Sequence, residues 1–223
     1  MKLYFARHGE SEANTLGVIS NRGLMYGLTE KGRQQAAALA ARLKDIRFAR
    51  LYSSPLLRAI QTAEILAREL RPDLEGLGDL RGLEIADALR EFDCGILEAQ
   101  SLPPHLDDYV RLFRDWQAGK WDRRFEGGES LLDIQARFVP FVERLTREHG
   151  EADHLLLISH GGVLLSALPI LLTNIDHAFA YEHIHFGNTD IVIAESTPTG
   201  WICLSWCGEQ LQNPKNQISN LKV

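Results

Sequence analysis

The chain has 223 residues, of which 45% are hydrophobic and 24% are charged, close to the averages of soluble globular proteins. This composition excludes a disordered, collagen-like or coiled-coil chain, and the length suits one large α/β domain or two small ones. With 24 basic and 30 acidic residues the net charge is -6. The surface as a whole will therefore not attract nucleic acid or anionic membranes, and any anion site must be a local cluster.

Three cysteines, Cys94, Cys203 and Cys207, are too few and odd in number for a disulfide framework. The spacing of Cys203 and Cys207 is by itself a weak metal signal, and the cysteine usage fits a reducing cytoplasm. The apolar start of the chain is interrupted at Arg7 and lacks a long hydrophobic region, so we expect no secretory signal and a mature protein that begins at Met1.

The first part of the chain alternates predicted strands and helices. We expect a strand at 2–6, a long glycine-rich loop and then a helix with Thr29 as its N-cap. A short strand at 51–53 runs into Ser54 and Pro55, an N-cap followed by proline at the first helical position. The second helix is therefore predicted to start at Pro55.

Two further amphipathic helices are predicted in the middle of the chain. One covers 106–113, after a proline pair. The other follows Ser130 and Asp133, which resemble a capping box, and Pro140 should kink it.

The last part of the chain predicts a buried strand, a buried helix and a hairpin. The apolar run 155–172 is long enough to suggest a membrane span, but His160, a glycine pair and Pro169 interrupt it. A buried strand followed by a buried helix explains this run better. A turn sequence between 190–195 and 201–206 indicates a β-hairpin.

Strands alternating with helices favour an α/β fold with a mostly parallel sheet and helices on both faces, to which the closing hairpin adds one antiparallel strand. We see no internal repeat and no linker that would split the chain. We therefore expect a single domain at 1–207, with an insertion or lid at about 92–128 and a polar C-terminal tail at 208–223.

Cationic and imidazole side chains gather at predicted strand ends, where ligands collect in a doubly wound sheet. Arg7 and His8 follow the first strand, Arg58 lies in the first turn of the second helix, and His160 ends the late buried strand. A cation in a first helical turn opposes the helix macrodipole unless an anion binds there. Taken singly, the arginine could be solvated and each histidine could be structural; their combination favours an anion site.

This set of side chains suits a phosphoryl group. Guanidinium groups match phosphate oxygens bidentately, and a neutral imidazole can act as a nucleophile that forms a covalent intermediate. Neighbouring positive charge disfavours imidazolium and keeps the nitrogen lone pair free. A metal site is less favoured, because the spacing of His8 and Glu10 is not helical and two arginines repel a dication.

Six blocks of the sequence carry a resemblance to a known family. They are LYFARHGESEAN (3–14), GLTEKGRQQA (27–36), SSPLLRAIQTA (53–63), LREFDCG (89–95), GGES (127–130) and ISHGG (158–162). In this order they resemble the histidine phosphatase (phosphoglycerate mutase-like) superfamily, over residues 3 to about 195. The resemblance implies an α/β fold around a mostly parallel sheet and catalysis through a phosphohistidine.

The resemblance also implies roles for single residues. Carried over position by position, it implies that His8 is the nucleophile and Glu91 the proton donor. It implies a phosphate clamp of Arg7, Arg58 and His160, with Asn14 and the backbone amide of Gly161 as further phosphate-binding groups. The chemistry needs the donor, because an alkoxide leaving group must be protonated and water must later be deprotonated. Among the alternatives Glu84, Glu98 and Glu129, position in the LREFDCG block selects Glu91.

Phosphatases and mutases of this superfamily share the core and differ around it. Residues 92–95 lack the basic residue and the tyrosine that are usual in mutases, and no lysine occurs in 96–102. The sequence also departs from common phosphatases, because Glu98 is followed by alanine where they usually have glycine. A mutase must also hold a second anionic group. Three basic residues of the predicted lid could contact such a group or form a solvated face, namely Lys120, Arg123 and Arg124.

We therefore predict a metal-independent phosphomonoesterase that hydrolyses a small organic phosphate through a phosphohistidine at His8 and uses no cofactor. The alternatives are a phosphoglycerate-type phosphomutase and a non-catalytic phosphate-binding module on the same fold; a proton donor beside a nucleophile argues against the latter. We expect a small phosphorylated metabolite as partner, no nucleic acid and no membrane, and a cytoplasmic location. A homodimer stays open, as do the natural substrate and pathway.

Overall fold

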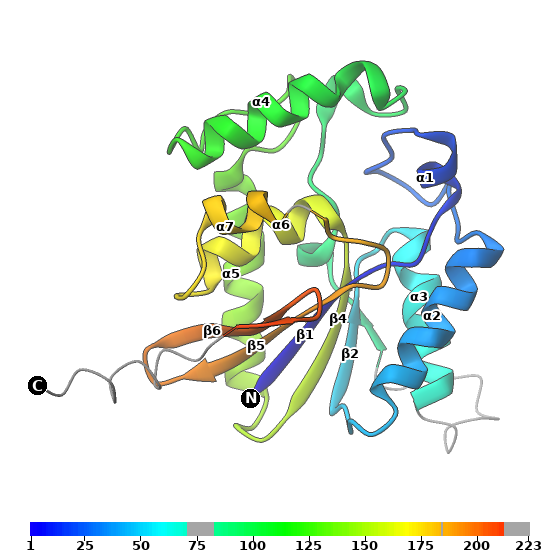
Figure 1. Ribbon diagram of the computed structural model, residues 1–223, viewed down its shortest axis with the longest axis vertical. Helices are drawn as coiled ribbons and strands as arrows, with labels where there is room; N and C mark the ends of the chain where they lie inside the picture. The colour runs from blue at the N-terminus through cyan, green and yellow to red at the C-terminus, as the bar shows by residue number, and fades with distance from the viewer. Residues whose placement is uncertain (71–82, 184, 212–223) are drawn as a thin grey trace, which may run out of the picture.

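The computed structural model describes residues 1–70, 83–183 and 185–211, and a mixed sheet forms its centre (Figure 1). Seven strands of these residues pair in the order β3-β2-β4-β1-β5-β6-β7. Their bounds are β1 (Lys2–Arg7), β2 (Arg50–Ser53), β3 (Leu83–Ile85), β4 (His154–Ser159), β5 (Ile191–Thr197), β6 (Gly200–Trp206) and β7 (Glu209–Gln210). The sheet has the predicted α/β character, with parallel pairing from β3 to β1 and antiparallel pairing from β1 to β7.

The helices lie on both faces of this sheet, as predicted. They are α1 (Glu12–Leu16), α2 (Glu30–Leu43), α3 (Leu57–Leu70), α4 (Leu106–Gln117), α5 (Leu131–Glu148), α6 (Gly161–Leu171) and α7 (His177–Glu182), with short 3-10 helices η2 (Asp87–Leu89), η3 (Gly95–Leu97) and η4 (Pro103–His105). Figure 1 shows α2 and α3 beside one face and α5 and α6 beside the other.

The alternating side chains of β1 explain the two layers. Successive residues of a strand point to opposite faces. Tyr4 and Ala6 therefore join a core that includes Leu39 of α2 and Ala59 of α3. Leu3 and Phe5 join the larger core on the other face, with apolar residues of α5 and α6. Both faces of the central strands are thereby buried.

The register of the central strands sets the position of the candidate site. β1 pairs in parallel with β4, and Arg7 lies opposite Ser159. The two strands therefore end together, which places the next residues, His8 and His160, at the same edge of the sheet. The rings of these histidines have centroids 5.0 Å apart.

The helix predicted to start at Pro55 begins at Leu57, so this boundary was wrong. The carbonyl of Leu56 accepts the first helical N–H groups, those of Ala59 and Ile60. Ser54 is not the N-cap, because it lies three residues before the first helical residue. Its hydroxyl accepts from the Leu56 amide (3.2 Å) in the preceding turn and lies 2.7 Å from Nε2 of His160.

Other predicted boundaries are confirmed. The Thr29 hydroxyl accepts from the Gly32 amide, and Ser130 and Asp133 form a reciprocal capping box. The helix α5 continues through Pro140, so the proline does not end it. The glycine-rich loop after β1 contains α1, a helix that the sequence analysis missed; Ser11 and its capping partner Asn14 were the available signal.

The run 155–172 forms the predicted buried strand and helix, β4 and α6. Within the described residues, no helix is both long and apolar enough to span a membrane. The predicted insertion at 92–128 contains α4, which lies beyond the carboxyl ends of the strands (Figure 1). The predicted tail begins differently than expected, because Glu209 and Gln210 form β7; residues 212–223 of that tail lie outside the described residues.

Candidate active site

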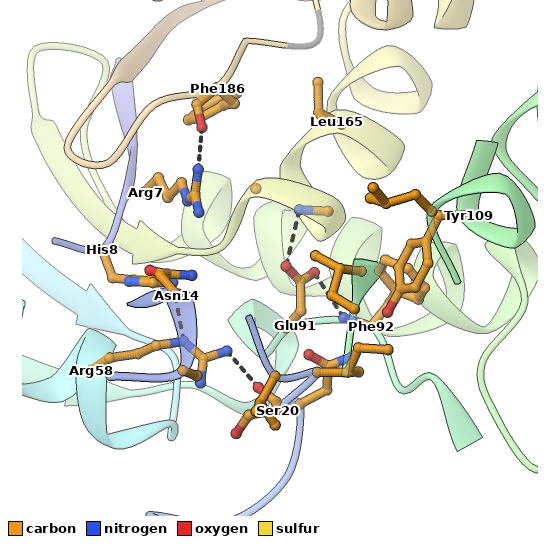
Figure 2. Close-up of a pocket in the computed structure, with 18 of the residues that line it drawn as sticks. Arg7, His8, Asn14, Ser20, Arg58, Glu91, Phe92, Tyr109, Leu165 and Phe186 are labelled. Atoms are coloured by element: carbon orange, nitrogen blue, oxygen red, sulfur yellow. Dashed lines mark hydrogen bonds between the residues drawn. The ribbon is translucent and has the colours of Figure 1, made fainter. Parts of the chain in front are cut away.

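A pocket of about 340 Å³ lies where β1 and α6 meet the insertion. Its polar end brings together most of the predicted site residues, as Figure 2 shows. The lining includes Arg7, His8, Asn14, Arg58, Glu91 and Gly161. His160 packs against His8 behind this lining, so all seven predicted residues belong to one site.

The hydrogen bonds of His8 define its tautomer. Its Nδ1 lies 2.6 Å from the carbonyl oxygen of Gly9, which can only accept, so Nδ1 carries the proton. The other nitrogen, Nε2, accepts from Nε–H of Arg58 at 3.0 Å. Burial first, and then the positive charges of Arg58 and Arg7, hold the pKa of His8 well below its usual value. The result is a neutral imidazole whose Nε2 lone pair faces the cationic groups.

Arg58 extends from the first turn of α3 into the polar end of the pocket. Only 6% of the residue is exposed, and its Nη2 donates to the carbonyl of Ser20 at 2.8 Å. Burial lowers the pKa of Arg58 to about 10, so the guanidinium stays charged at neutral pH. This buried charge opposes the positive end of α3 and has no ion-pair partner among the described residues. A bound anion would relieve both conditions.

Arg7, the last residue of β1, is held from the other side of the pocket. Its Nη1 donates to the carbonyl of Phe186 at 2.5 Å (Figure 2), and its buried Nε has no hydrogen-bond partner in the described structure. Leaving a buried donor unpaired costs about 1–3 kcal/mol. Arg7 therefore has a donor available for a ligand oxygen.

His160 is the N-cap residue of α6 and is fully buried. Its Nε2 lies 2.7 Å from the Ser54 hydroxyl, and its Nδ1 has no partner among the described groups. Burial, followed by the charge of Arg58, holds the pKa of His160 well below its usual value. Like His8, it is neutral at physiological pH. The sequence analysis missed the role of Ser54 because an N-cap explained the same residue.

Glu91 lies against the amino end of α6. Its carboxylate accepts three backbone N–H groups, from Phe92 (3.0 Å), Gly162 (3.0 Å) and Val163 (2.6 Å). Only glycine fits at Gly162, because a Cβ there would lie 2.8 Å from Oε1 of Glu91 and 2.6 Å from the ring of Phe92. The glycine pair therefore gives the carboxylate its place in the pocket.

The three alternative carboxylates lie outside the pocket lining. Glu84 pairs with Arg144, Glu98 accepts from the backbone of residues 21 and 22, and Glu129 pairs with Arg90 and Arg137. The geometry therefore selects the same carboxylate as the sequence block did.

Asn14 and Gly161 complete the polar end. The amide oxygen of Asn14 accepts from the backbone of Ser11 (3.1 Å) and from the side chain of Asn188 (3.4 Å), which leaves its NH₂ group to donate. Gly161 is the first residue of α6, and the N–H groups of a first helical turn have no acceptor within the helix. Both positions suit oxygen atoms of an anion.

The basic residues of the insertion do not reach the pocket. Lys120 pairs with Asp115 at 2.7 Å, Arg124 pairs with Asp133 at 2.8 Å, and Arg123 is exposed and absent from the lining. These positions favour the interpretation of a solvated basic face over contact with the substrate.

The other end of the pocket is apolar, and the sequence analysis did not find it. It is lined by Val18, Ile19, Leu102, Leu106, Tyr109, Val110, Phe113, Leu165 and Phe186. The available signal was the amphipathic stretch 106–113, whose apolar face could have been assigned to a core or to a ligand.

Comparison with known proteins places this geometry in a family. The model of the histidine phosphatase superfamily (branch 1) matches residues 3–208. The chain belongs to this superfamily. The matched region includes the sequence blocks that carry the resemblance and all the candidate site residues from Arg7 to Gly161.

Relatives within the superfamily have different described activities. A probable phosphoglycerate mutase from Escherichia fergusonii is 29% identical over 94% of this chain and 91% of its own length. A mycobacterial glucosyl-3-phosphoglycerate phosphatase, solved in complex with VO3, is 25% identical with a TM-score of 0.73, over 93% of this chain and 98% of the other. A phosphoserine phosphatase from Entamoeba histolytica shares the fold at 23% identity and a TM-score of 0.73, over 94% and 98%.

Proposed function

We propose that this histidine phosphatase superfamily member is a metal-independent phosphomonoesterase acting through a phosphohistidine at His8. The observation that carries the proposal is the state of His8. It is a neutral imidazole whose Nε2 accepts from the buried Arg58, the half-buried Arg7 lies at the same end of the pocket, and neither arginine has an ion-pair partner among the described residues. Two guanidinium groups supply the charge that a phosphoryl group requires. The described residues also contain no group of three or more metal-ligating side chains.

The first step transfers the phosphoryl group to the enzyme. The phosphate binds at the polar end of the pocket beside His8 and Arg58, where the Nε–H of Arg58 turns from Nε2 of His8 to a phosphate oxygen. The freed lone pair of Nε2 then attacks phosphorus in line with the ester oxygen. The new N–P bond forms as the P–O bond to the alcohol breaks. Arg7 and Arg58 stabilise the charge on the equatorial oxygens, and Glu91 protonates the departing alkoxide.

The second step returns the enzyme to its starting state. The carboxylate of Glu91 takes a proton from water, and the resulting hydroxide attacks phosphorus. The N–P bond breaks, phosphate leaves, and the electron pair returns to Nε2 of His8. One carboxyl group thus serves first as acid and then as base.

A mutase is the second candidate, because the relative from Escherichia fergusonii is described as a probable phosphoglycerate mutase. A mutase must hold a second anionic group while the phosphoryl group is exchanged. Arg7 and Arg58 are the only lysine or arginine residues in the described pocket lining, and both serve the transferred phosphate. This distribution of charge supports hydrolysis over transfer.

The remaining expectations also stand as proposals. We propose a small phosphorylated metabolite as the partner and the cytoplasm as the location, which the three free cysteines support. A catalytically idle binding module is less favoured, because Glu91 has no evident role in binding an anion.

The proposed function is tested by trapping the phosphoenzyme. Wild-type enzyme mixed with a radiolabelled phosphomonoester in EDTA and quenched in alkali should carry base-stable, acid-labile phosphate. The His8→Ala variant should carry none and turn over at less than about a thousandth of the wild-type rate. Retention of more than a tenth of the activity by a folded His8→Ala variant would overturn the assignment.

A further inference from the structure

The pocket continues from the catalytic groups to the underside of α4 without a charged side chain. Its lining there includes Tyr109, Val110 and Phe113 of α4 and Leu165 of α6. Figure 2 shows Tyr109 on the side of Glu91 away from His8, with Leu165 above Glu91 in this view. An alcohol leaving from a phosphate bound at His8 would occupy this apolar part, since it lies on the side of the proton donor.

The Tyr109 hydroxyl and the backbone of Ile19, which border the apolar part, already have hydrogen-bond partners. The Tyr109 hydroxyl lies 2.7 Å from the sulfur of Cys94, which also accepts from the Asn21 amide at 2.8 Å. The N–H of Ile19 donates to the carbonyl of residue 100, and its own carbonyl accepts from residue 99. At this part of the pocket, away from the polar end, a hydroxylated leaving group would exchange hydrogen bonds to water for contacts with apolar side chains, which is unfavourable.

Charge in the leaving group is opposed for a similar reason. The described lining offers a carboxylate or second phosphate no cation beyond the two arginines of the clamp. Arg111 and Arg114 of α4 are exposed and absent from the lining, and Lys120 and Arg124 pair with Asp115 and Asp133. Glu91, which carries negative charge in its ionised form, adds repulsion at the junction of the two parts.

The rim of the pocket offers apolar surface for a ligand to cover. Leu106 and Val110, one helical turn apart on α4, are 52% and 43% exposed and belong to the lining. Burial of such surface against an apolar ligand is favourable in proportion to its area. The same residues would gain nothing from a sugar or a hydroxy acid.

We propose that this site selects phosphomonoesters of uncharged, apolar alcohols, of the aryl or branched-alkyl class, over esters whose alcohol carries a carboxylate, a second phosphate or several hydroxyls. The inference rests on the proposed phosphatase function. It adds that α4 and Leu165, rather than further cations, determine which ester is hydrolysed.

The selectivity is tested with esters whose leaving alcohols differ in polarity but are all unactivated. We expect kcat/KM for cyclohexylmethyl phosphate to exceed the values for glycerol 1-phosphate, 3-phosphoglycerate and phosphoserine by about tenfold or more. Burst measurements with each ester report formation of phosphohistidine separately from binding.

A substitution at the rim provides the matched test. Val110→Lys places a cation in the lining and should lower kcat/KM for the cyclohexylmethyl ester about tenfold while raising it for 3-phosphoglycerate. Gln117→Lys adds the same charge to an exposed position at the end of α4, outside the lining, and should change neither.

The outcomes separate the two proposals. Hydrolysis of all four esters through phosphohistidine, with the charged or hydroxylated esters equal or preferred, would overturn the substrate class and leave the phosphatase function in place. Equal effects of Val110→Lys and Gln117→Lys would likewise overturn the role of α4. Absence of hydrolysis and of phosphohistidine with every ester would overturn the phosphatase function and this inference with it.

Discussion

At the scale of the residue, Arg58 would connect the proposed nucleophile to a phosphate bound in the pocket. Its Nε–H donates to His8, and its Nη2 is held by the carbonyl of Ser20. We expect Arg58→Ala to lower kcat by about 10²–10³, as loss of one transition-state donor does elsewhere. Because vanadate imitates the in-line transition state, the variant should also bind vanadate more weakly, so that the inhibition constant of vanadate rises as kcat falls.

The control for Arg58→Ala is Arg33→Ala, which removes an exposed arginine of α2. It should leave both the turnover and the vanadate inhibition unchanged. If Arg58→Ala behaved like this control, the guanidinium would have no part in phosphate binding.

Glu91 is distinguished from a passive neighbour by the leaving group. p-Nitrophenolate is stable without a proton, whereas an alkoxide is not. Glu91→Gln should therefore slow the first-turnover burst with an alkyl phosphate by about 10²–10⁴ and with p-nitrophenyl phosphate only mildly. Rapid-quench measurement is needed because water activation, slowed for both esters, dominates the steady state.

The glutamine of this variant turns one NH₂ group toward the amide donors of α6, so a change of structure must be checked. Vanadate inhibition of Glu91→Gln within a few-fold of wild type would show that the phosphate site is intact. An equal loss of burst rate on both esters would indicate a structural role and would remove Glu91 as the acid.

At the scale of the element, the segment that carries Glu91 has no regular structure of its own and is fixed by α5. Glu129 precedes this helix and accepts from Asp93 N–H (2.9 Å), Arg90 (2.7 Å) and Arg137 (3.0 Å). Arg137 also donates to the carbonyl of Ala88 at 2.6 Å. These bonds hold both sides of residues 88–93, so Glu129 is a positioning residue for the acid.

We expect Glu129→Gln to slow the burst with an alkyl phosphate by about tenfold and to change the burst with p-nitrophenyl phosphate much less. Arg144→Gln is the control, because Arg144 lies in the same helix and pairs with the carboxylate of Glu84, away from the site. Equal slowing of the two esters by Glu129→Gln would mean that it disturbs more than the acid.

The sequence predicts a helix boundary correctly where the local capping signal agrees with the packing of the folded protein. Thr29 and Ser130 are found as caps because each hydroxyl accepts from the helical amide three residues ahead. Ser54 lies before its helix and pairs with a histidine that follows a distant strand, which no local signal shows. The cationic end of the pocket could be predicted, because its basic and imidazole side chains lie at the ends of predicted strands that meet at one edge of the sheet. The apolar end could not, because an apolar face on α4 looks the same in sequence whether it covers a core or a cavity.

At the scale of the whole molecule, the buried neutral histidines affect stability. The pKa values of His8 and His160 in the folded protein lie well below 6.5, the ordinary value expected in the unfolded chain. Below that pH the unfolded chain therefore binds more protons than the folded one. The stabilising contribution is complete above pH 6.5 and declines as the pH falls, by about 1 kcal/mol per pH unit for each histidine.

Urea denaturation between about pH 7.5 and pH 5.5 measures this decline as a fall in the free energy of unfolding. The His8→Gln variant, which keeps a neutral polar side chain, should show a shallower decline than wild type. Identical pH dependence in the two proteins would show that His8 is not held neutral by its surroundings.

The central position of β1 has a consequence for synthesis on the ribosome. Residues 2–7 leave the ribosome well before their partners β4 and β5, which occupy 154–159 and 191–197, so both edges of β1 stay open during that interval. The waiting segment is apolar, with Leu3, Tyr4 and Phe5 all destined for the core. An open apolar strand pairs readily with another chain. The nascent protein should therefore need shielding of this strand, and the histidine that follows it can meet His160 only after β4 has been synthesised.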